Sequence, residues 1–273
     1  MIKMEDRPAK LYLDLMKMVL TNSIYKDASE SEVISRVFLT KNLLKFLRIF
    51  NLKVSLIQPF DSKRRLEGTD SPKFAHTMIG IKRLDNLQFC VEQIIKNQIP
   101  GDLIETGVWR GGACIFMKAI LRAYNIKNRK IWVADSFEGL PKTNTKNPKE
   151  EKIYFDSVNF LKVPLEEVKN NFKTYGLLDE QVCFLKGWFR DTLNSKSIKR
   201  LAILRIDGDL YESTTDALNN LYPKLSKGGF IIIDDFDDLE ACKKAVLDYR
   251  KENNIKEKII KINSRGAHWK RIY

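Results

Sequence analysis

The chain has 273 residues, of which 44% are hydrophobic and 30% charged, so it is long enough for a buried core and its composition excludes a disordered protein. No apolar run approaches the roughly 20 residues that span a bilayer, and the charged start MIKMEDRPAK lacks the apolar core of a signal peptide. The formal net charge of +13 either lies on a solvated surface, which the scattered lysines favour, or attracts a polyanion such as RNA.

Cysteine and histidine usage limits the possible metal sites. The four cysteines form no CxxC pair, and there are only two histidines, so neither a zinc–cysteine site nor a multi-histidine site is available. Well-separated cysteines are typical of thiols that stay reduced. We therefore expect a cytoplasmic protein with no membrane span.

The first third of the chain has a different texture from the rest. Residues 1–95 contain helical patterns at 10–20, 29–50 and 83–95, and no strand is compelling before residue 100. We expect this part to be a helical extension or lid on the domain that follows.

Residues 96–273 alternate between short apolar runs and longer amphipathic stretches, which is typical of an α/β domain whose mostly parallel sheet has helices on both faces. The runs that predict seven strands lie at 102–105, 131–135, 182–186, 201–207, 229–234, 258–262 and 268–273. The helical patterns lie at 113–124, 165–175, 214–222 and 239–253, and the polar stretch 141–151 predicts an exposed loop.

A glycine-containing turn follows the first of these strands. The segment DLIETGVWRGGA runs from residue 102 to 113, with Glu105 at the strand end and Gly107 and Gly111 before the next helix. Glycine lets a backbone approach a ligand at the carboxyl end of a parallel strand, where such sheets bind ligands. The spacing differs from the dinucleotide fingerprint GxGxxG. A tight turn with only a structural role is the alternative.

Two further strand ends support a cofactor that contains a nucleoside. Asp135 and Ser136 end the second strand, where an acid can accept hydrogen bonds from ribose hydroxyls. Gly187, Trp188 and Phe189 follow the third strand. The aromatic pair could form a wall for adenine, or could equally be ordinary core packing.

Three aspartates predict a metal site. Asp207 ends the fourth strand and Asp234 and Asp235 end the fifth, so they should lie at one rim of the sheet. Clustered carboxylates repel one another unless a cation neutralises them, and oxygen donors select Mg²⁺. The alternative is that these acids are helix caps, and it fits the neighbouring acids better (Asp209, Asp237 and Asp238). A cation there would activate a hydroxyl group, with Asp207 as both ligand and base; His76 or His268 is a less favoured base.

At these residues the sequence resembles the macrocin O-methyltransferase family, a branch of the class I methyltransferases. The matching segments include HTMIGIKRLDNLQ (76–88), GDLIETGVWRGGACIFMKA (101–119), WVADSFEGLP (132–141), LRIDGDLYEST (204–214) and YPKLSKGGFIIIDDF (222–236). The resemblance implies a Rossmann-like fold and an enzyme that uses S-adenosylmethionine and Mg²⁺ to methylate a sugar hydroxyl on a natural product or polysaccharide.

The resemblance also implies roles for individual residues. Asp207, Asp234 and Asp235 would hold the metal. The cofactor contacts would be Thr77, Met78, Glu105, Thr106, Gly107, Gly111, Asp135, Ser136, Gly187, Trp188 and Asp207, and His76 begins the segment beside the cofactor. The spacing of the three aspartates is also similar to that in catechol O-methyltransferase, but that enzyme's lysine base corresponds here to Leu210, so the base stays open.

Three functions compete at this point. The leading one is O-methylation of a sugar or glycoside, without nucleic acid and with a homodimer expected by analogy to enzymes that have such a lid. The second is a methyltransferase acting on RNA or another polyanion, because of the positive charge. The third is a non-catalytic cofactor-binding protein, which the clustered acids disfavour because they would only destabilise a protein that binds no cation.

Overall fold

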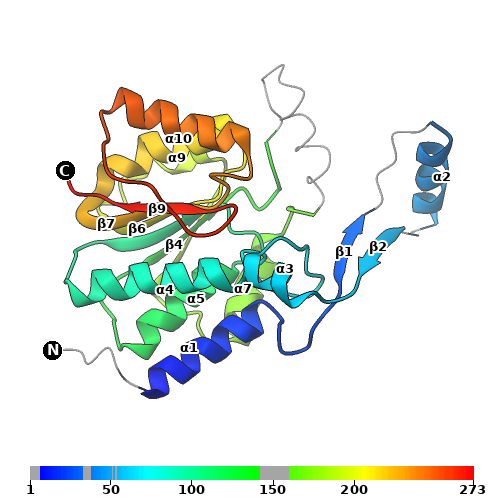
Figure 1. Ribbon diagram of the computed structural model, residues 1–273, viewed down its shortest axis with the longest axis horizontal. Helices are drawn as coiled ribbons and strands as arrows, with labels where there is room; N and C mark the ends of the chain where they lie inside the picture. Colours follow the sequence, from blue (N-terminus) through cyan, green and yellow to red (C-terminus); the bar gives the residue numbers. More distant parts are fainter. Residues whose placement is uncertain (1–6, 33–37, 51, 53, 142–159) are drawn as a thin grey trace.

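A seven-stranded sheet forms the centre of the computed structural model, which describes residues 7–32, 38–50, 52, 54–141 and 160–273 (Figure 1). The strands are β3 (Asp102–Thr106), β4 (Ile131–Asp135), β5 (Val182–Lys186), β6 (Leu201–Ile206), β7 (Leu225–Ile233), β8 (Ile260–Lys261) and β9 (Ala267–Lys270). Their order is β5-β4-β3-β6-β7-β9-β8. The first five in this order are parallel, and β9 is antiparallel to β7 and β8. The predicted α/β sheet is therefore confirmed.

The register brings the carboxyl ends of the four central strands to one rim. Thr106 of β3 pairs with Ala134 of β4 and with Ile206 of β6, and Ile206 pairs with Ile233 of β7. The central strands β3, β6 and β7 are buried over their last residues because both of their faces are covered. The residues that follow them thus emerge side by side at the same edge.

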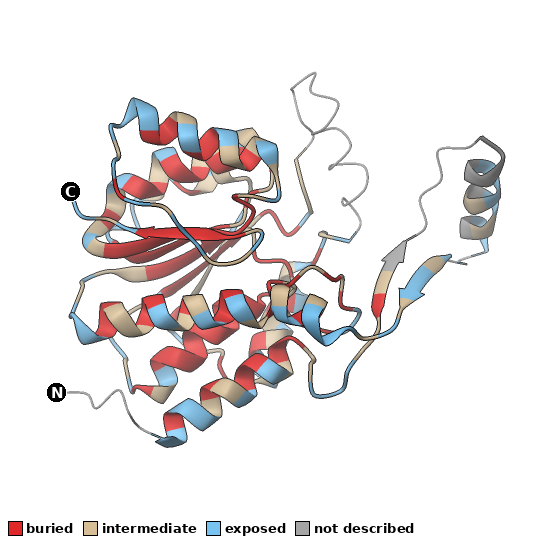
Figure 2. Cartoon of the chain, in the orientation of Figure 1, coloured by how far each residue is buried: buried red, intermediate tan, exposed pale blue. Residues whose placement is uncertain are grey.

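Helices cover both faces of the sheet, and each face has its own apolar core (Figures 1 and 2). One layer contains α1 (Arg7–Leu20), α4 (Gly80–Lys96), α5 (Gly112–Ala123) and α7 (Leu165–Thr174). The other contains α8 (Phe189–Thr192), α9 (Tyr211–Leu221), the 3-10 turn η1 (Tyr222–Lys224) and α10 (Glu240–Glu252). Both α1 and α4, from the predicted extension, pack on α5.

The prediction of one helix over residues 29–50, with no strand before residue 100, is wrong. Residues Ser29–Glu32 form strand β1, which pairs antiparallel with β2 (Ser55–Gln58), and α2 begins only at Phe38 and ends at Ile49. This two-stranded sheet and α2 project from the body of the protein (Figure 1). The polar sequence SESE of β1 has no apolar face, so its periodicity gave no strand signal. A short helix, α3 (Ser62–Glu67), leads back to α4.

Other boundaries differ by a few residues. Strand β6 ends at Ile206, so Asp207 follows it, and β7 begins four residues earlier than predicted, at Leu225. Residues 142–151 of the predicted loop lie outside the described part of the chain. Among the described helices, none has the length and apolar character needed to cross a membrane.

Candidate active site

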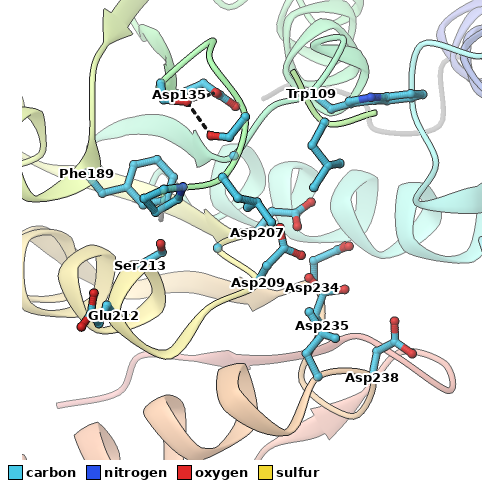
Figure 3. Close-up of a pocket in the computed structure, with 18 of the residues that line it drawn as sticks. Trp109, Asp135, Phe189, Asp207, Asp209, Glu212, Ser213, Asp234, Asp235 and Asp238 are labelled. Atoms are coloured by element: carbon cyan, nitrogen blue, oxygen red, sulfur yellow. Dashed lines mark hydrogen bonds between the residues drawn. The ribbon is translucent and has the colours of Figure 1, made fainter. Parts of the chain in front are cut away.

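A cavity of about 380 Å³ opens at the rim where the central strands end (Figure 3). It is bounded by the turns after β3, β4, β6 and β7, by α8 and the start of α9, and by Ser71, Met78 and Arg83 from the N-terminal third. Of the described residues that line it, eight are acidic and three are arginines. The cavity therefore has an excess of negative charge in a protein whose net charge is positive.

The glycine turn after β3 contacts the ends of the neighbouring strands β4 and β6. Gly107 has φ +83°, and a Cβ there would lie 1.8 Å from the carbonyl oxygen of Asp207. Its N–H donates to the carbonyl of Ala134 at 2.9 Å, and the N–H of Asp207 donates to the carbonyl of Thr106 at 2.9 Å. Only glycine fits this position, because both the left-handed backbone and the missing side chain are required. The turn thus holds the ends of β3, β4 and β6 in a fixed arrangement at the cavity.

Asp135 holds the same turn from β4. Its Oδ2 accepts a hydrogen bond from the N–H of Val108 at 2.8 Å, and its Oδ1 accepts one from the N–H of Phe137 at 2.7 Å. Burial raises the pKa of Asp135, and these backbone donors partly offset the rise. The hydroxyl of Ser136 donates to the carbonyl of Gly139 at 2.8 Å. Both residues line the cavity, so the carboxylate at the strand end combines a structural role with exposure to a ligand.

Three carboxylates meet at the tips of β6 and β7. One oxygen each from Asp207, Asp234 and Asp235 lies within 4.8 Å of the other two, and Figure 3 shows these side chains gathered beside Asp209. We call Asp207, Asp234 and Asp235 the carboxylate triad. Its geometry agrees with the predicted cluster at one rim.

Two buried arginines hold part of this charge. Arg205, on β6, donates to Asp207 at 3.0 Å and also pairs with Glu105 and Asp234. Arg83, on α4, pairs with the other oxygen of Asp234. Two cations thus pair with three carboxylates, and Asp235 adds a fourth, so the arginines leave the triad region negatively charged.

The pKa values report the same excess of negative charge. Burial, followed by the charge of Asp234, raises the pKa of Asp207 to about 6. Burial and the triad's other acids raise that of Asp235 well above its ordinary value. Burial would also raise the pKa of Asp234, but Arg205 and Arg83 more than offset it and lower the value. A divalent cation would relieve the repulsion, and an all-oxygen donor set suits a hard ion such as Mg²⁺, so the residues fit the ion that the sequence predicts.

The predicted cofactor, catalytic and metal-binding residues divide into two groups. Those that line the cavity are Met78, Gly107, Asp135, Ser136, Trp188, Asp207, Asp234 and Asp235. The predicted residues that are not part of its lining are His76, Thr77, Glu105, Thr106, Gly111 and Gly187. Glu105 is buried, with one oxygen paired to Arg205 and the other accepting a hydrogen bond from the Cys114 thiol at 2.9 Å.

Neither histidine lines the cavity. His76 Nδ1 lies 2.6 Å from the hydroxyl of Tyr175, and the backbone carbonyl of His76 accepts a hydrogen bond from the N–H of Gly112 at 3.0 Å. His268 is hydrogen-bonded to Asn86 at 3.1 Å. Burial lowers the pKa of both histidines. Both have structural partners, and their catalytic roles stay predictions.

Sequence reasoning missed several residues of the site. Asp209, interpreted as a cap, lines the cavity beside the triad, and burial, followed by the charge of Asp207, raises its pKa to about 7. The sequence could have indicated Arg205, because a charged residue in an otherwise apolar strand needs buried partners. No such pattern surrounds Arg83.

The likeness to known proteins covers almost the whole chain. The sequence model of the family described as "Macrocin-O-methyltransferase (TylF)" matches residues 9–271. The chain belongs to the macrocin O-methyltransferase family. This membership confirms the predicted family and the prediction of an S-adenosylmethionine-dependent O-methyltransferase.

Individual relatives agree with the family assignment. The chain is 49% identical over 269 residues, 95% of this chain and 92% of the relative, to 8-demethyl-8-(2,3-dimethoxy-alpha-L-rhamnosyl)-tetracenomycin-C 4'-O-methyltransferase of Streptomyces olivaceus. It is 47% identical over 265 residues, 96% and 94% of the two chains, to demethyldecarbamoylnovobiocin O-methyltransferase of Streptomyces niveus. The solved O-methyltransferase NovP is 46% identical with a TM-score of 0.82, over 97% of this chain and all of that one. The predicted class I fold is thereby confirmed.

Proposed function

We propose that this macrocin O-methyltransferase family member transfers the methyl group of S-adenosylmethionine to a hydroxyl of a sugar moiety, in a Mg²⁺-dependent reaction. The observation that carries the proposal is the carboxylate triad, whose oxygens lie within 4.8 Å of one another in the cavity that the glycine turn also lines. The methyl donor and the acceptor oxygen can therefore meet in one enclosed space.

The position of each residue in the cavity indicates its role. Gly107, Asp135 and Trp188 would bind the cofactor on one side, and Asp207, Asp234 and Asp235 would hold Mg²⁺ on the other. When bound, Mg²⁺ lowers the pKa of a hydroxyl group and fixes its oxygen. Asp207 would then accept the hydroxyl proton, and Asp209 is a second carboxylate within the same cavity. Gly107 keeps the two halves at a fixed separation, which supplies the alignment that methyl transfer requires.

The charge of the cavity favours a neutral or cationic acceptor. Eight acids against three arginines line it, so a polyanion such as RNA would meet repulsion that one divalent cation offsets only in part. An uncharged glycoside would not. The name of the Streptomyces olivaceus relative specifies a rhamnosyl-bearing substrate, which supports a sugar on an aglycone as the acceptor class.

The direct experiment measures release of S-adenosylhomocysteine with a panel of glycosides, in the presence of Mg²⁺ or a chelator. The proposal predicts turnover that is lost with chelator and in the Asp235→Asn variant. Asp238→Asn is the matched control, because Asp238 lines the same cavity but pairs with Arg265. Full activity in chelator, or in Asp235→Asn, would contradict the metal role. RNA binding that weakens steeply with salt would instead favour the polyanion hypothesis.

Three further features belong to the proposal. Residues 1–95 would act as the extension or lid that covers the cavity, supported by the positions of Ser71, Met78 and Arg83 in its wall. A cytoplasmic location agrees with four cysteines that form no disulfide.

A homodimer would give a partner to the exposed apolar side chains of α2 and β2, among them Phe46 and Ile57. Light scattering on wild type and on Ile57→Glu tests the dimer, which should dissociate in the variant.

A further inference from the structure

Arg83 crosses from the N-terminal third of the chain to the carboxylate triad. It lies on the first turn of α4, and its side chain is only 3% exposed. The aliphatic part passes over Gly266, where an added Cβ would lie 3.1 Å from Arg83 Cδ. The guanidinium then reaches Asp234 Oδ2, a partner 151 residues away in the sequence.

The guanidinium is held on its remaining sides by backbone carbonyls. Its Nε donates to Ile79 at 2.7 Å and its Nη2 donates to Gly68 at 3.0 Å. The two carbonyls are fixed because the backbones around Gly68 and Gly80 touch: a Cβ on Gly68 would lie 2.4 Å from the carbonyl carbon of Ile79. A planar fork with several donors can make all these bonds at once, whereas a lysine ammonium cannot.

Each of the two carboxylate oxygens of Asp234 therefore pairs with a different arginine. Arg205 takes Oδ1 from the strand beside it, and Arg83 takes Oδ2 from α4. The Asp234 side chain is 7% exposed, so its plane is set by these two partners and not by solvent. Each oxygen has a second lone pair, which leaves the carboxylate able to bind a cation in a fixed orientation.

We infer that Arg83 is a positioning residue of the metal site, which orients the Asp234 carboxylate toward the cation by anchoring it to the junction of α3 and α4. The inference rests on the proposed function, because it assumes that the triad holds Mg²⁺. Arg83 also brings a positive charge near the cation, which opposes binding. Orientation outweighs this repulsion, so the loss of the fork weakens Mg²⁺ binding even when the charge is kept.

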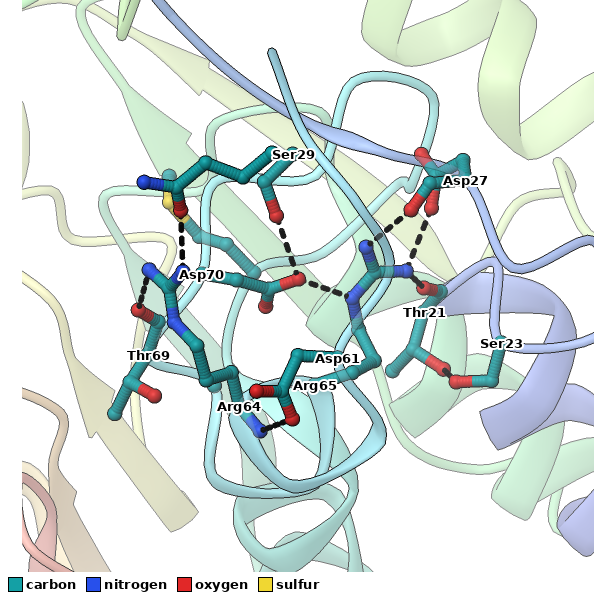
Figure 4. Close-up of polar contacts among 12 residues, drawn as sticks. Thr21, Ser23, Asp27, Ser29, Asp61, Arg64, Arg65, Thr69 and Asp70 are labelled. Atoms are coloured by element: carbon teal, nitrogen blue, oxygen red, sulfur yellow. Dashed lines mark hydrogen bonds and ion pairs between the residues drawn. The ribbon is translucent and has the colours of Figure 1, made fainter. Parts of the chain in front are cut away.

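The test is calorimetric titration of Mg²⁺ into wild type, Arg83→Lys and Arg65→Lys. Arg65 is the matched control: it is equally buried, also lies in the N-terminal third, and pairs with Asp27 and Asp70, each at 2.7 Å, without touching the triad (Figure 4). We expect Arg83→Lys to bind Mg²⁺ roughly 10- to 100-fold more weakly, with S-adenosylmethionine affinity unchanged. Arg65→Lys should bind Mg²⁺ as the wild type does.

The outcomes separate this inference from the function on which it rests. If wild type binds no Mg²⁺, both the metal proposal and the inference about Arg83 are wrong. If wild type binds but Arg83→Lys binds equally well, or Arg83→Gln binds more tightly, only the role of Arg83 is overturned. An equal loss in Arg65→Lys would also overturn it, since general loosening would then explain the effect. Should Arg83→Lys not fold, Arg83→Gln replaces it, and Mg²⁺ affinity equal to that of wild type in that variant would contradict the inference.

Discussion

Replacing Gly107 by alanine should separate the two halves of the cavity. The new Cβ would lie 1.8 Å from the Asp207 carbonyl oxygen, and a Cβ needs about 3.0 Å from such an atom, so the tips of β3 and β6 must move apart by about 1.2 Å. A misplacement of about 1 Å costs on the order of 100-fold in rate when catalysis depends on alignment. We therefore expect kcat in Gly107→Ala to fall by about 100-fold, with the protein still folded.

Gly176→Ala provides the control for backbone strain. Gly176 has φ +63°, and its added Cβ would meet nothing within 4 Å, so this variant carries the left-handed strain of roughly 1–2 kcal/mol without the clash. Steady-state kinetics with a glycoside acceptor, alongside the melting temperature, distinguishes the two effects. If Gly107→Ala keeps a kcat close to that of Gly176→Ala, the turn does not set the alignment and the reasoning is refuted.

Three other predictions concern titration and proton transfer. The pKa of Asp207 is raised to about 6 and that of Asp209 to about 7, so the stability these acids contribute is full below about pH 4 and is lost as the pH rises through 6 to 7. In the presence of a chelator, the melting temperature of wild type should therefore fall further between about pH 5.5 and pH 8 than that of Asp207→Asn does. Equal falls would contradict this prediction. Asp209→Asn should keep Mg²⁺ binding and most of kcat, whereas a fall of roughly 100-fold or more would make Asp209 the proton acceptor. His76→Gln, which breaks the bond to Tyr175 outside the cavity, should cost about 1 kcal/mol of stability with little change in kcat; a large loss of kcat at unchanged stability would give His76 the catalytic role.

The sequence predicted the parts of the site that depend on local pattern. Asp207 and Asp234 could be placed at one rim because each follows an apolar run, and parallel strands bring such ends together. Gly107 was readable for the same reason. Whether a residue follows a strand or begins a turn depends on its neighbours in the sequence, so it can be predicted without knowledge of the long-range packing.

The missed features depend on contacts between distant segments. The pattern placed Glu105 at a strand end, as it did Asp135, but β3 continues to Thr106, and the two oxygens of Glu105 are bonded to Arg205 and Cys114. Nothing near Arg83 in the sequence indicates a partner 151 residues away. Buried ion pairs of this kind form only once the fold has placed both partners in a low-dielectric interior, so single-sequence periodicity cannot reveal them.

The position of a bound cation would show whether the carboxylate triad is a metal site. Crystals grown with Mn²⁺ in place of Mg²⁺, together with S-adenosylhomocysteine, would give an anomalous signal that marks the ion. We expect one peak between Asp207, Asp234 and Asp235, with oxygen distances near 2.1–2.2 Å, close to those of Mg²⁺. A peak elsewhere, or an ion-free triad beside a bound cofactor, would contradict it.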